Sequence, residues 1–214
     1  MWLIPRLEAF QREFADIDIR VDASDVAVDL EVTDVDVAVR YARAERMPPG
    51  ALRMFGESVT PMASPWLLKS GPPLKQPTDV LGHTLIEAAD AYTPHLEWLT
   101  WRRWLDTHGM ARAQPKRWLS FNYAYQMTQA ALSGQGIVLA RPPLVAESLA
   151  RGELVEVFAG MRMRSPMAYW VLTAQRSAQR PEVIAFADWL SAQAVATREV
   201  TGEGLDPDER DDLD

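Results

Sequence analysis

Segments with strand-like and helix-like spacing alternate along most of the chain. In residues 17–21 and 35–39, apolar side chains alternate with charged ones, which is typical of half-buried strands. Leu7, Phe10 and Phe14 follow Pro5 at helical spacing, so a helix begins close to residue 1. This alternation predicts an α/β fold with mainly parallel sheets, and it argues against a β-sandwich or a helix bundle.

Further elements follow from the same periodicities and from capping residues. Asn122 is expected to cap a helix, Gly109 and Gly134 are expected to end helices, and Asp34 is expected at a turn that needs a left-handed residue. Further strands are predicted over 118–121, 137–140, 154–158 and 169–173, and helices over 25–32, 95–108, 123–133, from Pro142 onward, and over 181–195.

The composition allows a sizeable core. The 214 residues are 48% hydrophobic and 24% charged, which is close to the average of globular proteins. A chain of this length can form one large domain or two small lobes. It contains no cysteine, which excludes disulfides, thiolate metal ligands and a cysteine nucleophile.

The net charge of -8 is concentrated at the C-terminal end. Residues 199–214 contain eight carboxylates and one arginine, a net of -7, and subtracting this from -8 leaves -1 on residues 1–198. We expect residues 196–214 to form a disordered acidic tail. The nearly neutral remainder has no basic run, so we expect no direct DNA binding by this chain. Because no signal peptide or long apolar run is evident, we expect a cytoplasmic protein without membrane contact.

The sequence gives no positive sign of catalysis, of a metal or of another cofactor. His83, His95 and His108 lack metal-ligand spacing and are better explained as surface or capping residues. The G-x-G at Gly134 and Gly136 follows a helix and precedes a strand, the reverse of a dinucleotide-binding loop. Trp98, Trp101 and Trp104 are best explained as packing residues.

Several strings, taken in order, resemble the effector-binding domain of LysR-type transcription regulators, in the subgroup of glycine-cleavage and β-lactamase-gene regulators. Asp34 departs from the resemblance, because the family usually has glycine there. The matching strings are residues 2–10 (WLIPRLEAF), 29–30 (DL), 36–41 (DVAVRY), 61–65 (PMASP), 101–105 (WRRWL) with Gly109, 129–137 (QAALSGQGI), 169–170 (YW) and 186–190 (FADWL).

The resemblance implies a two-lobed fold of the periplasmic-binding-protein type 2 class, with two crossover strands and an effector held between the lobes. The crossings are expected near residues 60–64 and 166–169. Lobe one would comprise 1–61 plus 168–195, and lobe two 62–167. The first strand of lobe one has no counterpart in this sequence, nor do the DNA-binding domain and linker helix of such regulators, so Met1 is interpreted as the start of a fragment or of a misplaced reading frame.

The same resemblance places six residues at the effector: Ser64, Asn122, Tyr123, Ala124, Tyr169 and Arg40. A helix beginning near Ala124 would present free N–H groups to a carboxylate, which favours a small anionic metabolite. The alternative for Tyr123 and Tyr169 is that they only pack the wall between the lobes. Arg40 could pair with the effector or internally with Asp36 or Asp29.

The sequence therefore predicts an effector-sensing regulatory domain that is not an enzyme. Its partners would be a small-molecule effector and either a second copy of the chain or a paralogous regulator. The alternatives are a free-standing solute-binding protein, a non-functional fragment and, with least support, an enzyme on the same scaffold.

Overall fold

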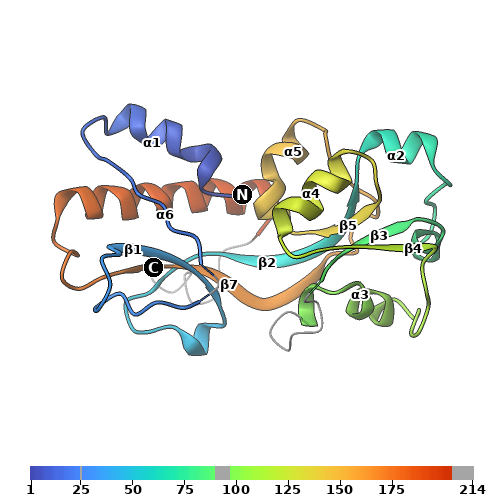
Figure 1. The fold of residues 1–214 in the computed structure, drawn as a ribbon, viewed down its shortest axis with the longest axis horizontal. Helices are drawn as coiled ribbons and strands as arrows, with labels where there is room; N and C mark the ends of the chain where they lie inside the picture. The colour runs from blue at the N-terminus through green and yellow to red at the C-terminus, as the bar shows by residue number, and fades with distance from the viewer. Residues whose placement is uncertain (25, 90–96, 204–214) are drawn as a thin grey trace, which may run out of the picture. The chain divides into compact units, whose positions relative to one another are not determined.

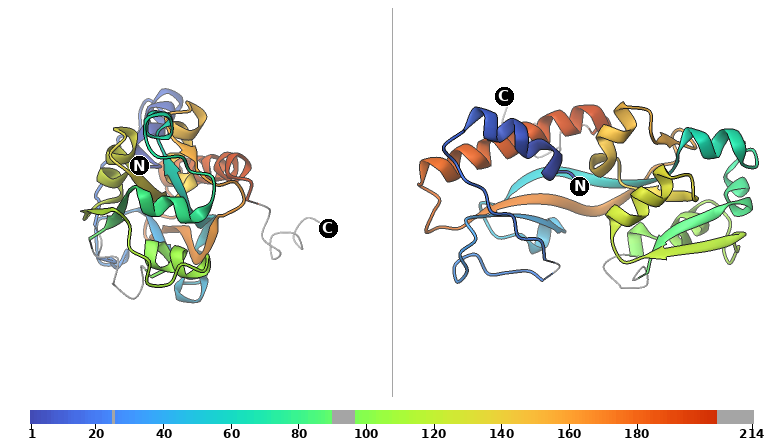
Figure 2. Two further views of the ribbon diagram at one scale, coloured as in Figure 1. Left: turned by 90° about the vertical axis from the view of Figure 1, so that its right-hand side faces the viewer. Right: turned by 45° about the horizontal axis from the view of Figure 1, so that its top comes forward.

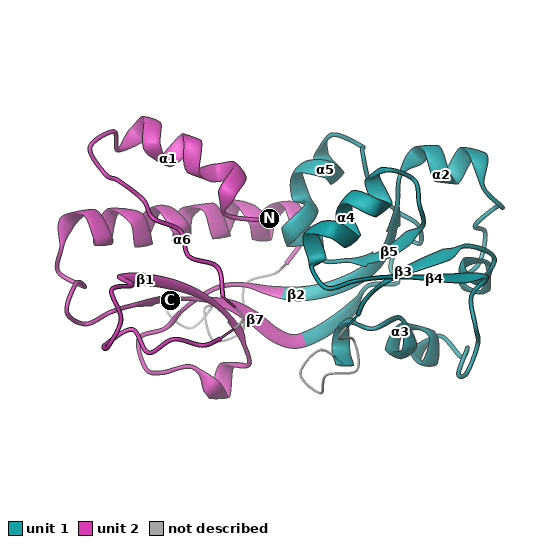
Figure 3. Cartoon of the chain, viewed as in Figure 1, with its two compact units in different colours: residues 1, 57–165 teal, residues 2–56, 166–214 magenta. Residues whose placement is uncertain are grey.

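The computed structural model describes residues 1–24, 26–89 and 97–203. The chain divides into two compact units (Figure 3). Unit 1 comprises Met1 and Glu57–Ser165, and unit 2 comprises Trp2–Gly56 and the chain from Pro166 onward. The two longest strands, β2 (Leu52–Ala63) and β7 (Met163–Thr173), each contribute residues to both units.

Strands and helices alternate as the sequence predicts (Figure 1). The remaining strands are β1 (Val37–Ala42), β3 (Thr84–Ala88), β4 (Arg117–Phe121), β5 (Ile137–Ala140) and β6 (Val155–Glu156). The α-helices are α1 (Leu7–Glu13), α2 (Pro65–Ser70), α3 (Trp101–Thr107), α4 (Ala124–Leu132), α5 (Ala146–Ala150) and α6 (Pro181–Thr201). Short 3-10 helices cover Ile4–Arg6, Ala44–Arg46, Pro77–Gly82, Glu97–Leu99 and Pro142–Val145.

The sheet of unit 1 has the strand order β2-β5-β3-β4, and β6 also pairs with β2. Strands β5, β3 and β4 run parallel, whereas β2 is antiparallel to β5 and β6. The α/β prediction is therefore confirmed, although the pairing is mixed. From β3 the chain moves through α3 to β4 at the sheet edge, and then returns through α4 to β5 on the other side of β3.

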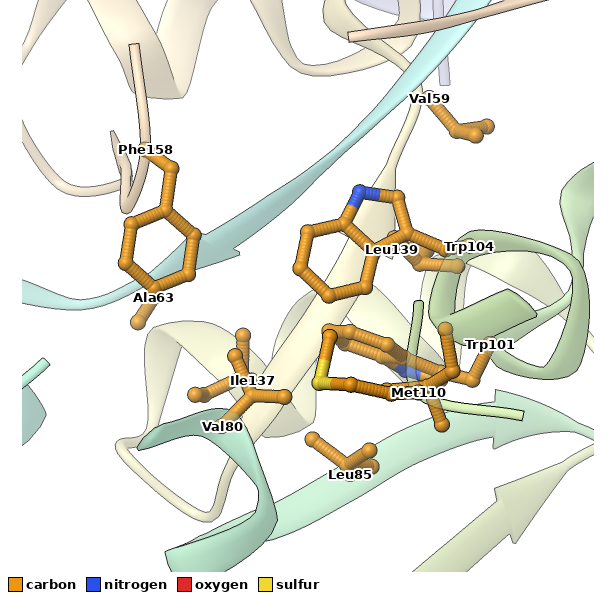
Figure 4. Close-up of a cluster of buried hydrophobic side chains, with 11 residues drawn as sticks. Val59, Ala63, Val80, Leu85, Trp101, Trp104, Met110, Ile137, Leu139 and Phe158 are labelled. Atoms are coloured by element: carbon orange, nitrogen blue, oxygen red, sulfur yellow. The ribbon is translucent and has the colours of Figure 1, made fainter. Parts of the chain in front are cut away.

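Two hydrophobic clusters cover the two faces of this sheet. Trp101 and Trp104 of α3 pack with Leu85 on one face (Figure 4). Helix α4 lies over the other face (Figure 2), where its residues Met127, Ala130 and Ala131 cluster with Ile86. Because neighbouring strand residues point to opposite faces, Leu85 and Ile86 serve different clusters. On β5, Ile137 belongs to the cluster of Leu85 and Val138 belongs to the cluster of Ile86. The sheet is thus buried on both faces.

Unit 2 is built around β1, which pairs antiparallel with β7, and around α1 and α6. The fully buried ring of Phe10 on α1 makes edge contacts with Phe186 and Trp189 of α6, at centroid distances of 5.1 and 5.2 Å. Phe14 stacks on Phe10 at 4.7 Å. This aromatic group ties the two helices together.

Three predictions for the segment between α1 and β1 are wrong. Residues 17–21 form no strand, because no strand of the described chain pairs with them, and alternation without a ladder leaves the backbone in irregular structure. Residues 26–32 form bends and turns rather than a helix, and position 25 lies outside the described residues. Asp34 lies in a bend but does not have a left-handed φ. Among the described non-glycine residues, positive φ occurs at Arg112 instead.

Other boundaries also differ from expectation. The last helix continues to Thr201 and ends at Gly202 with φ 68°, so residues 196–201 do not belong to a disordered tail; 204–214 lie outside the described residues. The strand expected over 154–158 is limited to β6. The helix expected over 95–108 is α3, and His95 lies outside the described residues. Within the described ranges, no helix is both long and apolar enough to cross a membrane.

Candidate functional site

The carboxyl ends of β3, β4 and β5 meet at one edge of the unit 1 sheet. Because β3 leads to one neighbouring strand and the chain later returns to its other side, the strand order reverses at β3. In open α/β sheets such a reversal opens a crevice at the carboxyl edge, where ligands bind. Residues that follow Phe121 and Ala140 therefore lie at the place where a ligand is expected.

The N-terminus of α4 lies at this edge, directly after β4. Tyr123 is the N-cap residue with extended backbone, and its side chain makes no capping hydrogen bond. The expected cap, Asn122, is therefore wrong by one position, and its side chain is exposed. Ala124 is the first helical residue. Tyr123 is 59% exposed, so its ring does not pack in the core of unit 1.

Gln126 adds an acceptor in the first turn of α4. Its Oε1 atom is buried and has no hydrogen-bond partner within the described structure. A buried amide oxygen without a donor costs free energy, on the order of 1–3 kcal/mol. The first turn of α4 thus combines N–H groups that no side chain caps with an acceptor that a ligand donor would satisfy.

Charged residues that the sequence analysis did not single out lie on β2 and directly after β5, near the same edge. The Glu57 side chain is fully buried and pairs with Arg141, with 3.3 Å between Oε1 and Nη1. Thr60 pairs in register with Ala140 and donates to Glu156 at 3.5 Å. A buried carboxylate is tolerated when a cation and hydrogen bonds compensate its lost hydration.

Glu87 on β3 is a buried carboxyl group close to α3. Its Oε1 accepts a hydrogen bond from the backbone N–H of Trp101 at 3.3 Å. Burial raises the pKa of Glu87 above its ordinary value, and the hydrogen bond from Trp101 opposes this only in part. The indole of Trp101 donates to the carbonyl of Ile86 at 2.9 Å, which fixes the start of α3 on β3.

Ser64 lies far from Tyr123. Its side chain is 4% exposed and caps α2 by accepting from the N–H of Leu67 at 3.3 Å. A side chain added at Gly134 would lie 3.5 Å from the Ser64 hydroxyl, so Ser64 is next to the C-terminal end of α4. The nine residues of α4 separate its two ends by about 13 Å. The structure does not bring Ser64 to the helix start.

Tyr169 and Arg40 belong to unit 2, on opposite faces of the β1–β7 pair. Tyr169 pairs in register with Tyr41, and their rings lie 5.0 Å apart; Phe55 packs on Tyr169 at 4.9 Å. Arg40 pairs in register with Trp170, one residue further along β7. Because side chains alternate across a strand, Arg40 faces away from the tyrosine pair.

Arg40 lines a pocket of unit 2 with a volume of about 510 Å³. Its guanidinium donates to the carbonyl of Val28, and among the described residues it pairs with neither Asp36 nor Asp29, the two internal partners considered from the sequence. Asp36 is instead close to Arg176 and Arg180, at 3.5 and 3.4 Å. The pocket walls also contain Asp29, Glu31 and Gln175 and apolar residues, among them Val28, Leu30, Pro48, Pro49, Ala51 and Leu172.

Comparison with known proteins assigns the family. Residues 1–195 match the LysR substrate binding domain. The chain belongs to the LysR substrate-binding domain family. The resemblance of the sequence strings to LysR-type regulators is thereby confirmed, and so is the type of two-lobed fold that the resemblance implies.

The relatives of this LysR substrate-binding domain include transcription regulators. It is 31% identical to the glycine cleavage system transcriptional activator of Escherichia coli K12 over 198 residues, which cover 92% of this chain and 62% of the activator. It is 29% identical to the transcriptional activator AmpR of Pseudomonas aeruginosa over 194 residues, covering 90% and 62% of the two chains. The chain thus spans less than two thirds of these relatives.

Solved structures agree with this LysR substrate-binding fold. The effector domain of AmpR from Pseudomonas aeruginosa has a TM-score of 0.68 at 28% identity, covering 94% of this chain and 91% of that chain. CrgA of Neisseria meningitidis has a TM-score of 0.68 at 22% identity, covering 90% and 64%, which supports the fold alone.

Within this LysR domain, sequence analysis missed Glu57, Arg141 and Gln126. Glu57 and Arg141 are 84 positions apart, and nothing in their spacing links them. Gln126 lies three residues after Tyr123, but the periodicity of α4 does not show that its amide oxygen has no partner. Only the register of β2 on β5 and the packing of α4 reveal these positions.

Proposed function

We propose that this domain senses a small carboxylate-bearing metabolite and, within a longer chain, controls transcription. The observation that carries the proposal is the start of α4, which lies at the reversal of strand order and has no side-chain cap. Helix N-termini stabilise anions through their N–H groups and their partial positive charge. The relatives are named transcriptional activators, which favours regulation over a free-standing solute-binding protein or an enzyme.

The effector-contacting residues in this proposal are Asn122, Tyr123 and Ala124. Tyr169 and Arg40 remain proposed contacts on the strength of the family resemblance. The same resemblance supports the proposal that the effector is held between two lobes with the expected boundaries. Ser64 is the weakest of the six, because its hydroxyl already caps α2 at the other end of α4. A second copy of the chain or a paralogous regulator completes the proposed set of partners, and the cytoplasm is the proposed location.

The substitution Ala124→Pro tests the anion site without removing the helix. Proline is tolerated at the first helical position and lacks an N–H group. The extended backbone of Tyr123, with φ -127° and ψ 137°, is compatible with a following proline. A metabolite carboxylate is first found by a screen for a raised melting temperature, and its dissociation constant is then measured by calorimetry.

We expect Ala124→Pro to raise the dissociation constant of that ligand about tenfold, because one hydrogen bond to a charged group is lost. Tyr125→Ala is the matched control, since Tyr125 is exposed and its backbone N–H is retained. Tyr123→Ala should also reduce binding. If Ala124→Pro and Tyr123→Ala both bind the ligand as tightly as the unaltered chain, the site at α4 is wrong.

A separate experiment addresses DNA. We expect the 214-residue chain to give no sequence-specific footprint on a promoter at moderate salt, because its charge pattern offers no basic face. A footprint with nanomolar affinity would contradict the assignment of this chain to the regulatory part alone.

A further inference from the structure

The carboxylate of Glu203 lies against β2 in unit 2. Gly202 ends α6 in the left-handed conformation, and the N–H of Glu203 donates to the carbonyl of Arg198 at 2.9 Å. The Glu203 Oε1 atom accepts from Arg53 Nη2 at 2.5 Å and from the backbone N–H of Gly56 at 2.7 Å. The side chains of Arg53 and Glu203 are each only 21% exposed. One carboxylate oxygen therefore has both a guanidinium and a strand N–H as donors.

Gly56 makes room for this arrangement. A Cβ atom at this position would lie 2.8 Å from Arg53 Nη2 and 2.9 Å from Glu203 Oε1, closer than real Cβ atoms approach other atoms. The backbone of Gly56 is not left-handed, so space rather than conformational freedom explains the glycine. A side chain here would displace the carboxylate from the N–H group.

The surrounding structure is held by contacts that do not involve Glu203. The indole N–H of Trp2 donates to the hydroxyl of Thr197 on α6 at 2.8 Å. The ring of Trp2 also packs on Phe55, the neighbour of Gly56, at a centroid distance of 5.3 Å. These contacts hold the end of α6 and the strand independently of Glu203, so the N–H of Gly56 keeps its place when the carboxylate is removed.

We propose that Arg53 and the N–H of Gly56 form a carboxylate-binding site, and that Glu203 is its intramolecular ligand. Charge-assisted hydrogen bonds from a guanidinium and a backbone amide are the donors that a carboxylate prefers. Partial burial weakens the competition from water and salt that makes surface ion pairs worth little. Gly56 is also the last residue of β2 in unit 2, before the chain enters unit 1 at Glu57. Occupation of the site therefore orders β2 where it leaves unit 2.

Acetate can test the site, because Glu203→Ala removes a methylene and a carboxylate that acetate approximates in size. We expect Glu203→Ala to lower the melting temperature of the full chain by about 2–4 °C in sodium chloride. Sodium acetate at the same ionic strength, about 0.1 M, should recover at least half of that loss. Glu199→Ala is the matched control, since Glu199 is an exposed glutamate on the last turn of α6 and should show neither effect.

Two further measurements separate the site from a general salt effect. The double variant Arg53→Ala with Glu203→Ala should lose the response to acetate, and the Gly56 amide resonance should move on Glu203→Ala and return toward its original position with acetate. An equal response to acetate in the unaltered chain and the double variant would overturn the proposal, as would an unmoved Gly56 resonance. Because the site lies in unit 2 and α4 lies in unit 1, these results do not depend on the proposed effector site.

Discussion

The backbone N–H and C=O groups of unit 1 and unit 2 find their hydrogen-bond partners in different ways. In unit 1, β3 is paired along both edges, and helices cover both faces of the sheet. In unit 2, the described residues 15–24 and 26–36 belong to no strand, and side chains anchor part of the 26–36 segment. Arg176 donates to the carbonyls of Thr33 and Val35, and Glu31 accepts from the N–H of Gln175 at 2.9 Å.

The difference predicts how each unit responds to change. A sheet buried on both faces cannot collapse into the cavity that a shortened side chain leaves, because hydrogen bonds on either side fix its backbone. An irregular segment held by a few side chains can move and fill the space. We therefore expect unit 1 to be costly to perturb, and residues 26–36 of unit 2 to open locally with little free energy.

The largest effect is expected from Trp104→Ala in unit 1. Trp104 is fully buried against Trp101, at a centroid distance of 5.4 Å, and against Phe158. The change should lower the free energy of unfolding by about 4 kcal/mol, as measured by urea denaturation. Trp66→Ala is the control, since Trp66 is 64% exposed and should cost less than about 1 kcal/mol. Similar losses for the two variants would contradict the assignment of the core.

One leucine deletion in each unit compares them directly. Leu85 is fully buried in the central strand β3, and Leu30 is 7% exposed in the irregular segment. We expect Leu85→Ala to cost about 4 kcal/mol and Leu30→Ala about 2 kcal/mol, because only the surroundings of Leu30 can collapse into the space. Urea denaturation of both variants provides the comparison. An equal or larger loss for Leu30→Ala would mean that the segment is as rigid as the sheet.

A smaller effect is expected from Arg176→Ala, which removes the hydrogen bonds to Thr33 and Val35. The cost should be about 1 kcal/mol, accompanied by faster amide hydrogen exchange in residues 26–36. Arg151→Ala serves as the control, because Arg151 pairs with Glu147 and Glu153 on the surface and should have little effect. Unchanged exchange in 26–36 would show that Arg176 does not hold the segment.

The smallest effect concerns Glu87, whose pKa is raised by burial above the ordinary value of 4.5. Between that value and the raised pKa, the folded state binds more protons than the unfolded state, so the free energy of unfolding falls as pH rises. Glu87→Gln keeps an oxygen that can accept from the N–H of Trp101 but does not titrate. The stability of the variant relative to the unaltered chain should therefore increase with pH through this window. A constant difference from pH 4 to pH 8 would contradict the raised pKa.

The sequence by itself determined the α/β class and most elements of unit 1. The strands predicted over 118–121 and 137–140 are found as β4 and β5, whereas β3 (Thr84–Ala88) was not predicted, because a short run that is buried on both faces shows no alternation of apolar and polar residues. The family was also accessible, because its strings keep their order along the chain. The start of α4 was predicted to within one residue, because the sequence shows a strand, a turn and a helix in succession there.

The tertiary structure decided which alternating segments became strands and which polar groups met. Residues 17–21 alternate as well as 35–39 do, but only the latter overlap a strand, β1 (Val37–Ala42), which pairs with β7. A strand is stable only when its backbone groups are paired. Ser64 and Tyr123 were predicted to share a site, yet α4 holds them at opposite ends. Glu203 reaches Gly56 across 147 positions, since convergence of side chains depends on how strands and helices pack and not on their spacing in the chain.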